Sequence, residues 1–172
     1  GFNGSPPPKL RTPDKRLIEF GAAAKVGDEE HWQGQPHSRL GLDEVVQFSE
    51  KQVRFLMGWV RSIDPKERCR VVMTSNPPMS VEGQWIVAMF RTWLDETHPN
   101  PAKPGELRWY ITDKEGKDKE VGGPEPVVME DGKTNRPLSR TFIPGRLSDN
   151  PDLARTDYQA RLDALQEPIR SA

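Results

Sequence analysis

The stretch between Leu40 and Thr74 constrains the fold of this chain more than any other part of the sequence. It begins with a short apolar strand, Leu40–Leu42, and ends with a second apolar strand, Val71–Thr74. Between them, residues 49–62 carry apolar side chains at the i, i+3, i+4 and i+7 positions of a helix: Val53, Leu56, Met57 and Val60. A helix that connects two strands in this way usually makes them parallel neighbours, so we expect an α/β fold.

Strands and helices continue to alternate along the chain, at a spacing of about 30 residues. We expect further strands at Arg16–Ala23, Leu107–Thr112 and Ser139–Pro144, and further helices at Ser80–Asp95 and Asp149–Gln166. The predicted fold class is therefore α/β, with a mostly parallel sheet flanked by helices. Residues 1–14 are rich in proline and predict a flexible segment ahead of a single domain, 15–172.

Composition limits the classes of function. The 25 Lys and Arg residues nearly balance the 26 Asp and Glu residues, so the net charge of −1 gives the whole chain no general attraction to nucleic acid or membranes. No apolar stretch approaches the ~18 residues that a membrane helix needs. The single cysteine, Cys69, excludes an internal disulfide, and the three histidines do not have the spacing of a zinc site. We therefore expect a protein of a reducing cytoplasm without a membrane partner.

Two adjacent acids, Asp43 and Glu44, follow the first strand directly. The carboxyl ends of parallel strands meet at one edge of a sheet, so we expect Thr74, Ser75 and Asn76 to lie beside these acids. In a nucleotide triphosphatase, one such carboxylate holds Mg²⁺ and the second polarises the attacking water. The alternative is a structural role, because carboxylates also favour the positive end of the dipole of the helix that follows.

Several separated motifs resemble, in order and spacing, the ATPase domain of the large terminase subunit of tailed bacteriophages. They are GLDEVVQFSEKQVRFLMGWVRS, RVVMTSNPP, EGQWIVAMFRTWLD, HPNPAKPGELRW and SRTFIPGRLSDNP, and the resemblance covers about residues 15–170. That family is a DNA-packaging motor with an N-terminal P-loop ATPase domain and a nuclease domain of RNase H-like fold. For this chain the resemblance implies an incomplete P-loop NTPase core of the ASCE type.

The resemblance also assigns roles by position. Asp43 resembles the Walker B aspartate that binds Mg²⁺, and Glu44 resembles the catalytic glutamate. The motif that couples hydrolysis to movement corresponds to Thr74, Ser75 and Asn76. Two further residues are implied as nucleotide contacts: Gln33, in the loop just before Walker B, and Arg146.

The phosphate-binding Walker A loop, G-x-x-x-x-G-K-S/T, is missing from the 172 residues. The Gly-Lys-Thr at Gly132–Thr134 has Val127 where the first glycine is required, and we expect a hairpin turn there. The strand before Asp43 is interrupted by Arg39 and Gly41, so we expect it to be short. The sequence therefore predicts the C-terminal portion of the ATPase domain, from Walker B onward. It lacks the phosphate-loop strand and the nuclease domain, and it is expected to hydrolyse ATP negligibly by itself.

The expected function is that of a fragment of a phage or prophage packaging enzyme, in which ATP hydrolysis drives double-stranded DNA into the procapsid. The family's partners are implied as well: double-stranded DNA, the small terminase subunit, the portal protein and further copies in a ring. ATP and Mg²⁺ would be cofactors of the intact protein, in the cytoplasm of the bacterial host. The alternative is a non-catalytic prophage remnant or adaptor that keeps the fold for protein contacts.

Basic residues offer two further candidates. One run is a candidate contact for DNA phosphates: Arg61, Lys66, Arg68 and Arg70. A solvated loop is the simpler interpretation of this run, because two acidic residues dilute its charge. Arg140 or Arg146 is a candidate arginine finger, reaching phosphates of the same or a neighbouring subunit.

Overall fold

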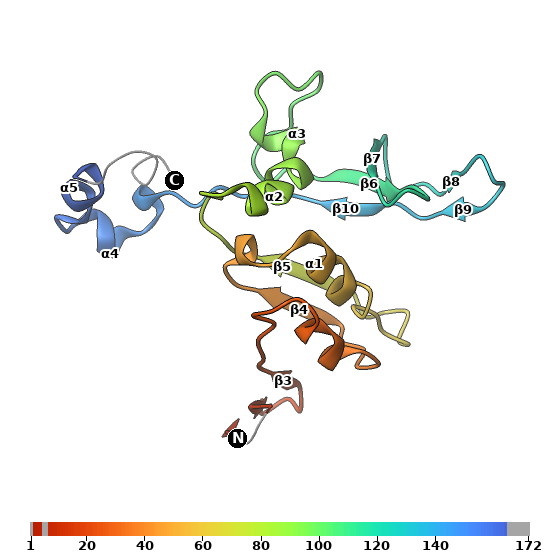
Figure 1. Ribbon diagram of the computed structural model, residues 1–172, viewed down its shortest axis with the longest axis horizontal. Coiled ribbons are helices and arrows are strands. Elements are labelled where there is room, and N and C mark those ends of the chain that lie inside the picture. The colour runs from red at the N-terminus through yellow and green to blue at the C-terminus, as the bar shows by residue number, and fades with distance from the viewer. Residues whose placement is uncertain (1, 5–6, 165–172) are drawn as a thin grey trace. The chain divides into compact units, whose positions relative to one another are not determined.

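The computed structural model describes residues 2–4 and 7–164 and contains both helices and strands (Figure 1). The α/β class predicted from the sequence is therefore correct in its coarse form. The chain forms two compact units, Gly1–Pro77 and Pro78–Ala172. None of the helices within the described ranges is long and apolar enough to cross a lipid bilayer.

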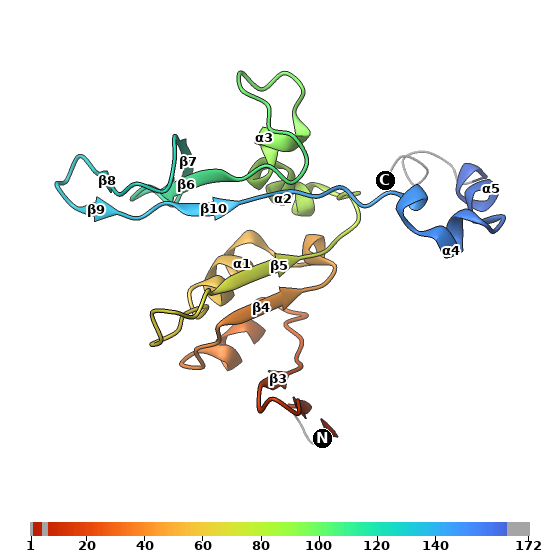
Figure 2. The same cartoon turned by 180° about the vertical axis from the view of Figure 1, so that it is seen from behind.

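A strand–helix–strand motif forms the centre of the first unit (Figure 2). Strands β4 (Arg39–Leu42) and β5 (Arg70–Met73) are connected through helix α1 (Glu50–Met57) and pair in parallel. The pairing places Leu42 opposite Met73. This confirms the predicted strand, helix and parallel neighbour.

Helix α1 is fixed at its start by a capping box. The Ser49 hydroxyl accepts a hydrogen bond from the backbone N–H of Gln52, and the Gln52 side chain accepts one from the backbone N–H of Ser49. The amide nitrogen of Gln52 also donates to the carbonyl oxygens of Ala23 (3.2 Å) and Lys25 (2.9 Å). Val53 is fully buried on the face of the helix that packs inward. The helix ends at Met57, earlier than the predicted residue 62, because Gly58 follows as its C-cap.

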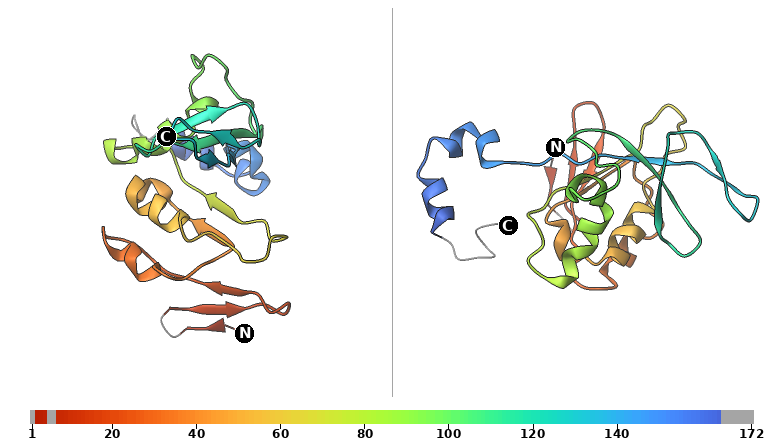
Figure 3. Two further views of the ribbon diagram at one scale, coloured as in Figure 1. Left: turned by 90° about the vertical axis from the view of Figure 1, so that its right-hand side faces the viewer. Right: turned by 90° about the horizontal axis from the view of Figure 1, so that it is seen from above.

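Three short antiparallel strands precede this motif and lie at the red end of the chain in Figure 3. They are β1 (Phe2–Asn3), β2 (Lys9–Arg11) and β3 (Leu17–Glu19). Two of them fall within residues 1–14, which we expected to be a flexible segment. Lys9 lies opposite Glu19 in the register and forms an ion pair with it, and such opposite charges stabilise a strand pair.

Trp32 is the last residue of a short 3₁₀-helix, η1 (Asp28–Trp32). Its ring contacts the His37 ring edge-on, with centroids 6.0 Å apart. The ring also covers Gly21, where an added Cβ would lie 2.0 Å from the Cζ2 atom of Trp32. Trp32 is therefore a packing residue that holds the chain just before β4.

The second unit is built on an antiparallel sheet with the strand order β10-β6-β7. Its strands are β6 (Arg108–Thr112), β7 (Asp118–Val121) and β10 (Leu138–Arg140), and its first helices are η3 (Val81–Gly83), α2 (Gln84–Met89) and α3 (Arg91–Leu94). A hairpin of β8 (Val127–Val128) and β9 (Thr134–Asn135) turns at Gly132, which has a φ of 78°. This confirms the predicted hairpin turn at Gly132–Thr134. The last elements are η4 (Leu147–Asp149), α4 (Pro151–Ala154) and α5 (Tyr158–Asp163).

The expectation of a mostly parallel sheet is wrong for the described residues. Among the strands of this part of the chain, β4 and β5 are the pair that runs parallel, and the other sheets are antiparallel. In the second unit the reason is the short connection between β6 and β7, residues 113–117. A connection of that length makes a hairpin, whereas a parallel crossover needs a dozen or more residues.

The helix predicted at Ser80–Asp95 is interrupted at Phe90. Nη1 of Arg140 donates a 2.6 Å hydrogen bond to the carbonyl oxygen of Met89. That carbonyl would accept from Trp93 in a continuous helix, but the Trp93 N–H donates to Phe90 instead. The arginine therefore ends α2 and starts a new turn, α3.

The predicted C-terminal helix is also divided, and the predicted strand Ser139–Pro144 is ordered as a strand only to Arg140. The hydroxyl and the N–H of Thr156 both donate to the carbonyl oxygen of Leu153. Such local side-chain bonds compete with helix continuation and separate α4 from α5. Asn150 caps α4, and residues 165–166 of the predicted helix lie outside the described residues.

Replacing Gly21 by alanine tests the packing of Trp32. We expect Gly21→Ala to lower the free energy of unfolding by about 1–3 kcal/mol, because the new methyl group occupies the place of the indole ring. The measurement is urea unfolding. Gly41→Ala is the matched control, since nothing lies within 4 Å of its added Cβ, and an equal loss in both variants would contradict the prediction.

Candidate functional site

The ends of β4 and β5 bring together Asp43 and Thr74, which are 31 positions apart in the sequence. The N–H of Thr74 donates to the carbonyl oxygen of Leu42 (2.9 Å), and the N–H of Val45 donates to the carbonyl oxygen of Thr74 (3.0 Å). These two bonds continue the parallel pairing past the last strand residues. Asp43 and Thr74 therefore lie side by side at the carboxyl edge, as the sequence predicts.

The carboxylate of Asp43 is held through one of its oxygens. The Thr74 hydroxyl donates a 2.6 Å hydrogen bond to Oδ1, and the N–H of Glu44 donates to the same oxygen at 3.1 Å. Oδ2 forms no hydrogen bond with any residue in the described ranges. The side chain is exposed, so a fixed carboxylate presents one unused oxygen to the solvent.

Glu44 has an unusual backbone. Its φ of 50° and ψ of 49° lie in the left-handed region, which side chains other than glycine disfavour by roughly 1–2 kcal/mol. The residue is the N-cap of a 3₁₀-helix, η2 (Val45–Gln47), and it is half-buried. A non-glycine residue kept in this conformation is typical of functional sites, where strain fixes the direction of a side chain.

The three residues after β5 differ in how they are held. Thr74 bonds Asp43, and the Ser75 hydroxyl accepts a weak 3.4 Å hydrogen bond from the N–H of Val46. Asn76 is exposed, and its side chain forms no hydrogen bond with any described residue. The structure thus joins Thr74 and Ser75 to the loop after β4 and leaves the amide of Asn76 available.

No hydrogen bond or ion pair among the described residues joins the side chain of Gln33 to this edge. Gln33 is exposed and follows η1 as its C-cap. Arg146 is exposed in the second unit, where it precedes η4. Arg140 is committed to its own unit, because it pairs with Asp118 at 2.8 Å and stacks 4.3 Å from the ring centroid of Tyr110. That fixed position does not suit an arginine finger.

The residues at Asp43 fit Mg²⁺ only if water and nucleotide phosphates supply most of its ligands. Within the part of the chain that the structure describes, no three His, Cys, Asp or Glu side chains are grouped to hold a metal ion by themselves. Mg²⁺, however, is commonly bound by one or two carboxylates together with water and substrate phosphates. Oδ2 of Asp43 is such a carboxylate oxygen, so the site suits an ion that arrives with a nucleotide.

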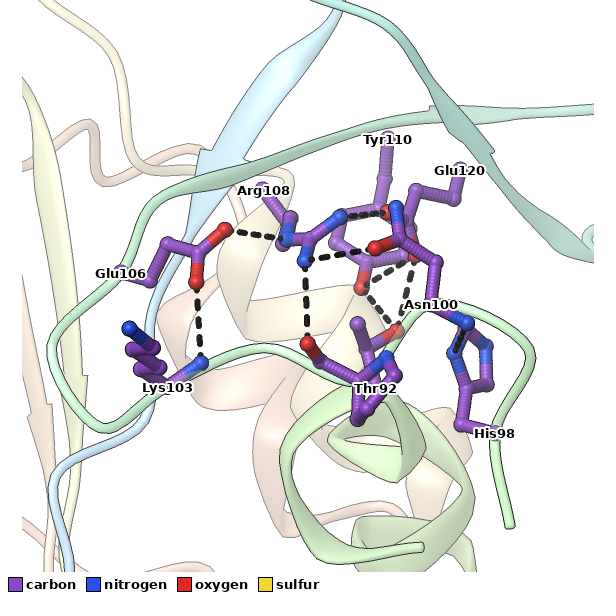
Figure 4. Close-up of polar contacts among 9 residues, drawn as sticks. Thr92, His98, Asn100, Lys103, Glu106, Arg108, Tyr110 and Glu120 are labelled. Carbon is purple, nitrogen blue, oxygen red and sulfur yellow. Dashed lines mark hydrogen bonds and ion pairs between the residues drawn. The ribbon is translucent and has the colours of Figure 1, made fainter. Parts of the chain in front are cut away.

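A second polar cluster, which the sequence reasoning missed, lies in the second unit beside an open cavity of about 560 Å³ (Figure 4). Its centre is Arg108, a side chain only 14% exposed. Nη1 of Arg108 bonds Glu120 at 3.0 Å, and Nη2 donates to the carbonyl oxygen of Pro101 at 3.3 Å. Nε lies 3.0 Å from Glu106, without hydrogen-bond alignment, so this contact is electrostatic.

The cluster continues inward through buried hydroxyl groups. Thr92 lies 2.7 Å from the Tyr110 hydroxyl and donates to Glu120 at 2.9 Å. Burial raises the pKa of Tyr110, and Glu120 adds to that rise. Because each guanidinium nitrogen of Arg108 faces a protein oxygen, the cluster is occupied with its own contacts and is best described as structural. The register of β6 and β7 places Tyr110 opposite Glu120, and no pattern in the sequence of these two strands marks the cluster.

Comparison of the chain with models of protein families, with curated proteins and with solved structures found no match.

Replacing Glu44 by glycine separates backbone strain from side-chain chemistry. We expect Glu44→Gly to raise the free energy of unfolding by about 1 kcal/mol, because glycine adopts a positive φ without steric cost. Glu44→Ala keeps the strain and serves as the control in the same urea titrations. A glycine variant no more stable than the alanine variant would show that the left-handed conformation carries no strain.

The raised pKa of Tyr110 predicts that the stability of the folded state decreases at high pH. The folded state keeps the phenol proton above pH ~10, where the unfolded chain loses it, so stability falls as pH rises from about 10 through the folded pKa. We expect Tyr110→Phe to remove this fall, at a loss of about 1 kcal/mol at neutral pH for the hydroxyl contacts. Unfolding free energies at pH 8 and pH 11 provide the measurement. Tyr158→Phe, at the exposed second tyrosine, is expected to change neither value.

Proposed function

We propose that this chain is a portion of the ATPase domain of a phage or prophage large terminase subunit. The observation that carries the proposal is the meeting of Asp43 and Thr74 at the carboxyl edge of a parallel strand pair. It is the arrangement that a Walker B strand and its neighbour require. The choice of the terminase family rests on the motifs along the chain that resemble terminases. The finer assignment to a P-loop NTPase core rests on the same resemblance.

In this proposal each residue at the carboxyl edge has a separate role. Mg²⁺ bound with ATP would supply the charge that stabilises the transferring phosphoryl group. Asp43 would hold it through Oδ2, while the Thr74 hydroxyl keeps Oδ1 turned inward. Glu44, directed by its backbone, would accept a proton from the attacking water. Asn76 would bond the γ-phosphate or that water and so report the nucleotide state to the rest of the domain.

The wider role follows from the family and is equally a proposal. The intact protein would couple hydrolysis to the translocation of double-stranded DNA into a procapsid, in the cytoplasm of a bacterial host. It would do so with the small terminase subunit, the portal protein and further copies of itself. Gln33 and Arg146 remain predicted nucleotide contacts. A non-catalytic adaptor is the competing function, and the experiment below separates the two.

A paramagnetic metal tests the proposed site without requiring turnover. We expect Mn²⁺ with ADP to broaden the amide NMR signals of residues 43–46 and 74–76 first, because the free oxygen of Asp43 and the nucleotide phosphates share the ion. Asp43→Asn should weaken this effect at least tenfold in Mn²⁺ concentration. Thr74→Val should weaken it less, and Thr74→Ser should restore it.

The chain supplies its own control for simple charge attraction. Glu130 and Asp131 are also adjacent acids, placed at the turn between β8 and β9. Equal broadening at this turn and at residues 43–46 would contradict the proposal. Broadening that is unaffected by the nucleotide would favour the adaptor.

A further inference from the structure

The broken helix of the second unit, residues 84–94, contains no residue that would force a break. Sharp kinks in helices usually occur at proline, at glycine or serine pairs, or where a side chain inserts into the backbone hydrogen bonds. None of the residues 84–94 is proline, glycine or serine. The backbone nevertheless leaves the helix at Phe90, whose φ of −110° and ψ of 20° differ from the helical values of about −63° and −42°. The cause is therefore an inserted side chain, that of Arg140.

The break removes hydrogen bonds that a continuous helix would make. Because α2 ends at Met89 and α3 begins at Arg91, the N–H of Arg91 does not bond the carbonyl oxygen of Val87. The N–H of Trp93 does not bond Met89 either, since it donates to the carbonyl oxygen of Phe90 at 3.0 Å. A continuous helix would recover both bonds, so it is the conformation that competes with the broken one.

Three contacts hold the side chain of Arg140 in the break. Nη1 donates to the carbonyl oxygen of Met89 at 2.6 Å, and Nη2 forms an ion pair with Asp118 at 2.8 Å. The guanidinium group also lies over the ring of Tyr110, 4.3 Å from its centroid. The side chains of Arg140 and Asp118 are only 17% and 13% exposed. Because a buried charge without its partner is costly, Arg140 is stable either fully docked or withdrawn to the solvent.

The strand that carries Arg140 is the easiest one of its sheet to move. Arg140 is the last residue of β10, a three-residue strand at the edge of the sheet, where hydrogen bonds hold it on one side only. Past the strand, the ring of Phe142 packs on Phe90 with the centroids 5.8 Å apart. Detachment of β10 from β6 would therefore withdraw Arg140 and uncover the residue at which the helix is broken.

We propose that Arg140 and residues 84–94 form a two-state switch. With Arg140 docked, the helix is broken at Phe90, and with Arg140 withdrawn, α2 and α3 join into one helix. Strand β10 is the moving part that selects between the two states. The switch uses no residue of the carboxyl edge at Asp43, so it stands or falls separately from the ATPase proposal.

The switch also acts on the buried hydroxyl groups of the second unit. A change in the backbone of Phe90 reorients α3 relative to α2, and Thr92 lies in α3. The Thr92 hydroxyl lies 2.7 Å from that of Tyr110 and donates to Glu120 at 2.9 Å (Figure 4). Joining the helices therefore breaks these contacts, and the docked state of Arg140 is the one that preserves them.

Amide hydrogen exchange and ¹³Cα chemical shifts of the purified chain test the switch. We expect Arg140→Met to slow the exchange of the Arg91 amide about tenfold, because a continuous helix gives this N–H an acceptor. The ¹³Cα shift of Phe90 should move toward the value of a helical residue. If Arg140 only stabilised the unit, its removal would speed this exchange. Unchanged or faster exchange at Arg91 in folded Arg140→Met would overturn the proposal.

The matched control is Arg108→Met, because Arg108 lies opposite Arg140 in the register of β10 and β6. Its guanidinium group bonds Glu120 and Pro101, so its loss should not slow exchange at Arg91, and equal slowing in both variants would overturn the proposal. Amide signals of β7 report whether each variant is folded.

A milder variant keeps the proposal testable if Arg140→Met does not fold. Asp118→Asn removes the ion pair and leaves Arg140 in the chain, so the docked state is weakened but not abolished. We expect about threefold slower exchange at Arg91 in this variant. Exchange as fast as in the unchanged chain, or faster, would overturn the switch.

Discussion

The parallel pairing of β4 with β5 is the interaction on which the candidate site depends. Its register sets Leu42 against Met73, and the next residues of each strand are Asp43 and Thr74. A shift of one residue would turn every side chain of one strand to the other face and would separate the hydroxyl from the carboxylate. The pair is short, and α1, the helix that connects its two strands, buries Val53 and Leu56.

In the second unit, charged and polar side chains lie between the sheet and helix α3. The face of its sheet that meets α3 carries Arg108, Tyr110 and Glu120, and Thr92 of that helix bonds two of them. Pairs of this kind contribute little net stability when complete, but the loss of one partner leaves a costly unpaired charge. The cluster therefore favours one packing of helix against sheet over others that would bury the same area.

The sequence contained enough information for the strand–helix–strand motif and for the meeting of its strand ends. Periodicity gave the helix, and chain connectivity gave the parallel neighbour, because a crossover through a helix allows little else. The left-handed backbone of Glu44 left no trace in the sequence, since glycine or asparagine would be the usual residue at such a φ. The break at Phe90 was also hidden, because it depends on Arg140, a residue fifty positions away that takes the carbonyl of Met89.

The contacts of Gln52 couple the motions of two segments of the first unit. One side chain both caps the start of α1 and holds the carbonyl oxygens of Ala23 and Lys25. Fraying of the first helical turn must therefore release the loop at residues 23–25, and opening of that loop must loosen the helix. The backbone amides of the two segments should exchange with solvent as one cooperative unit, at a single rate, although the chain places them more than twenty residues apart.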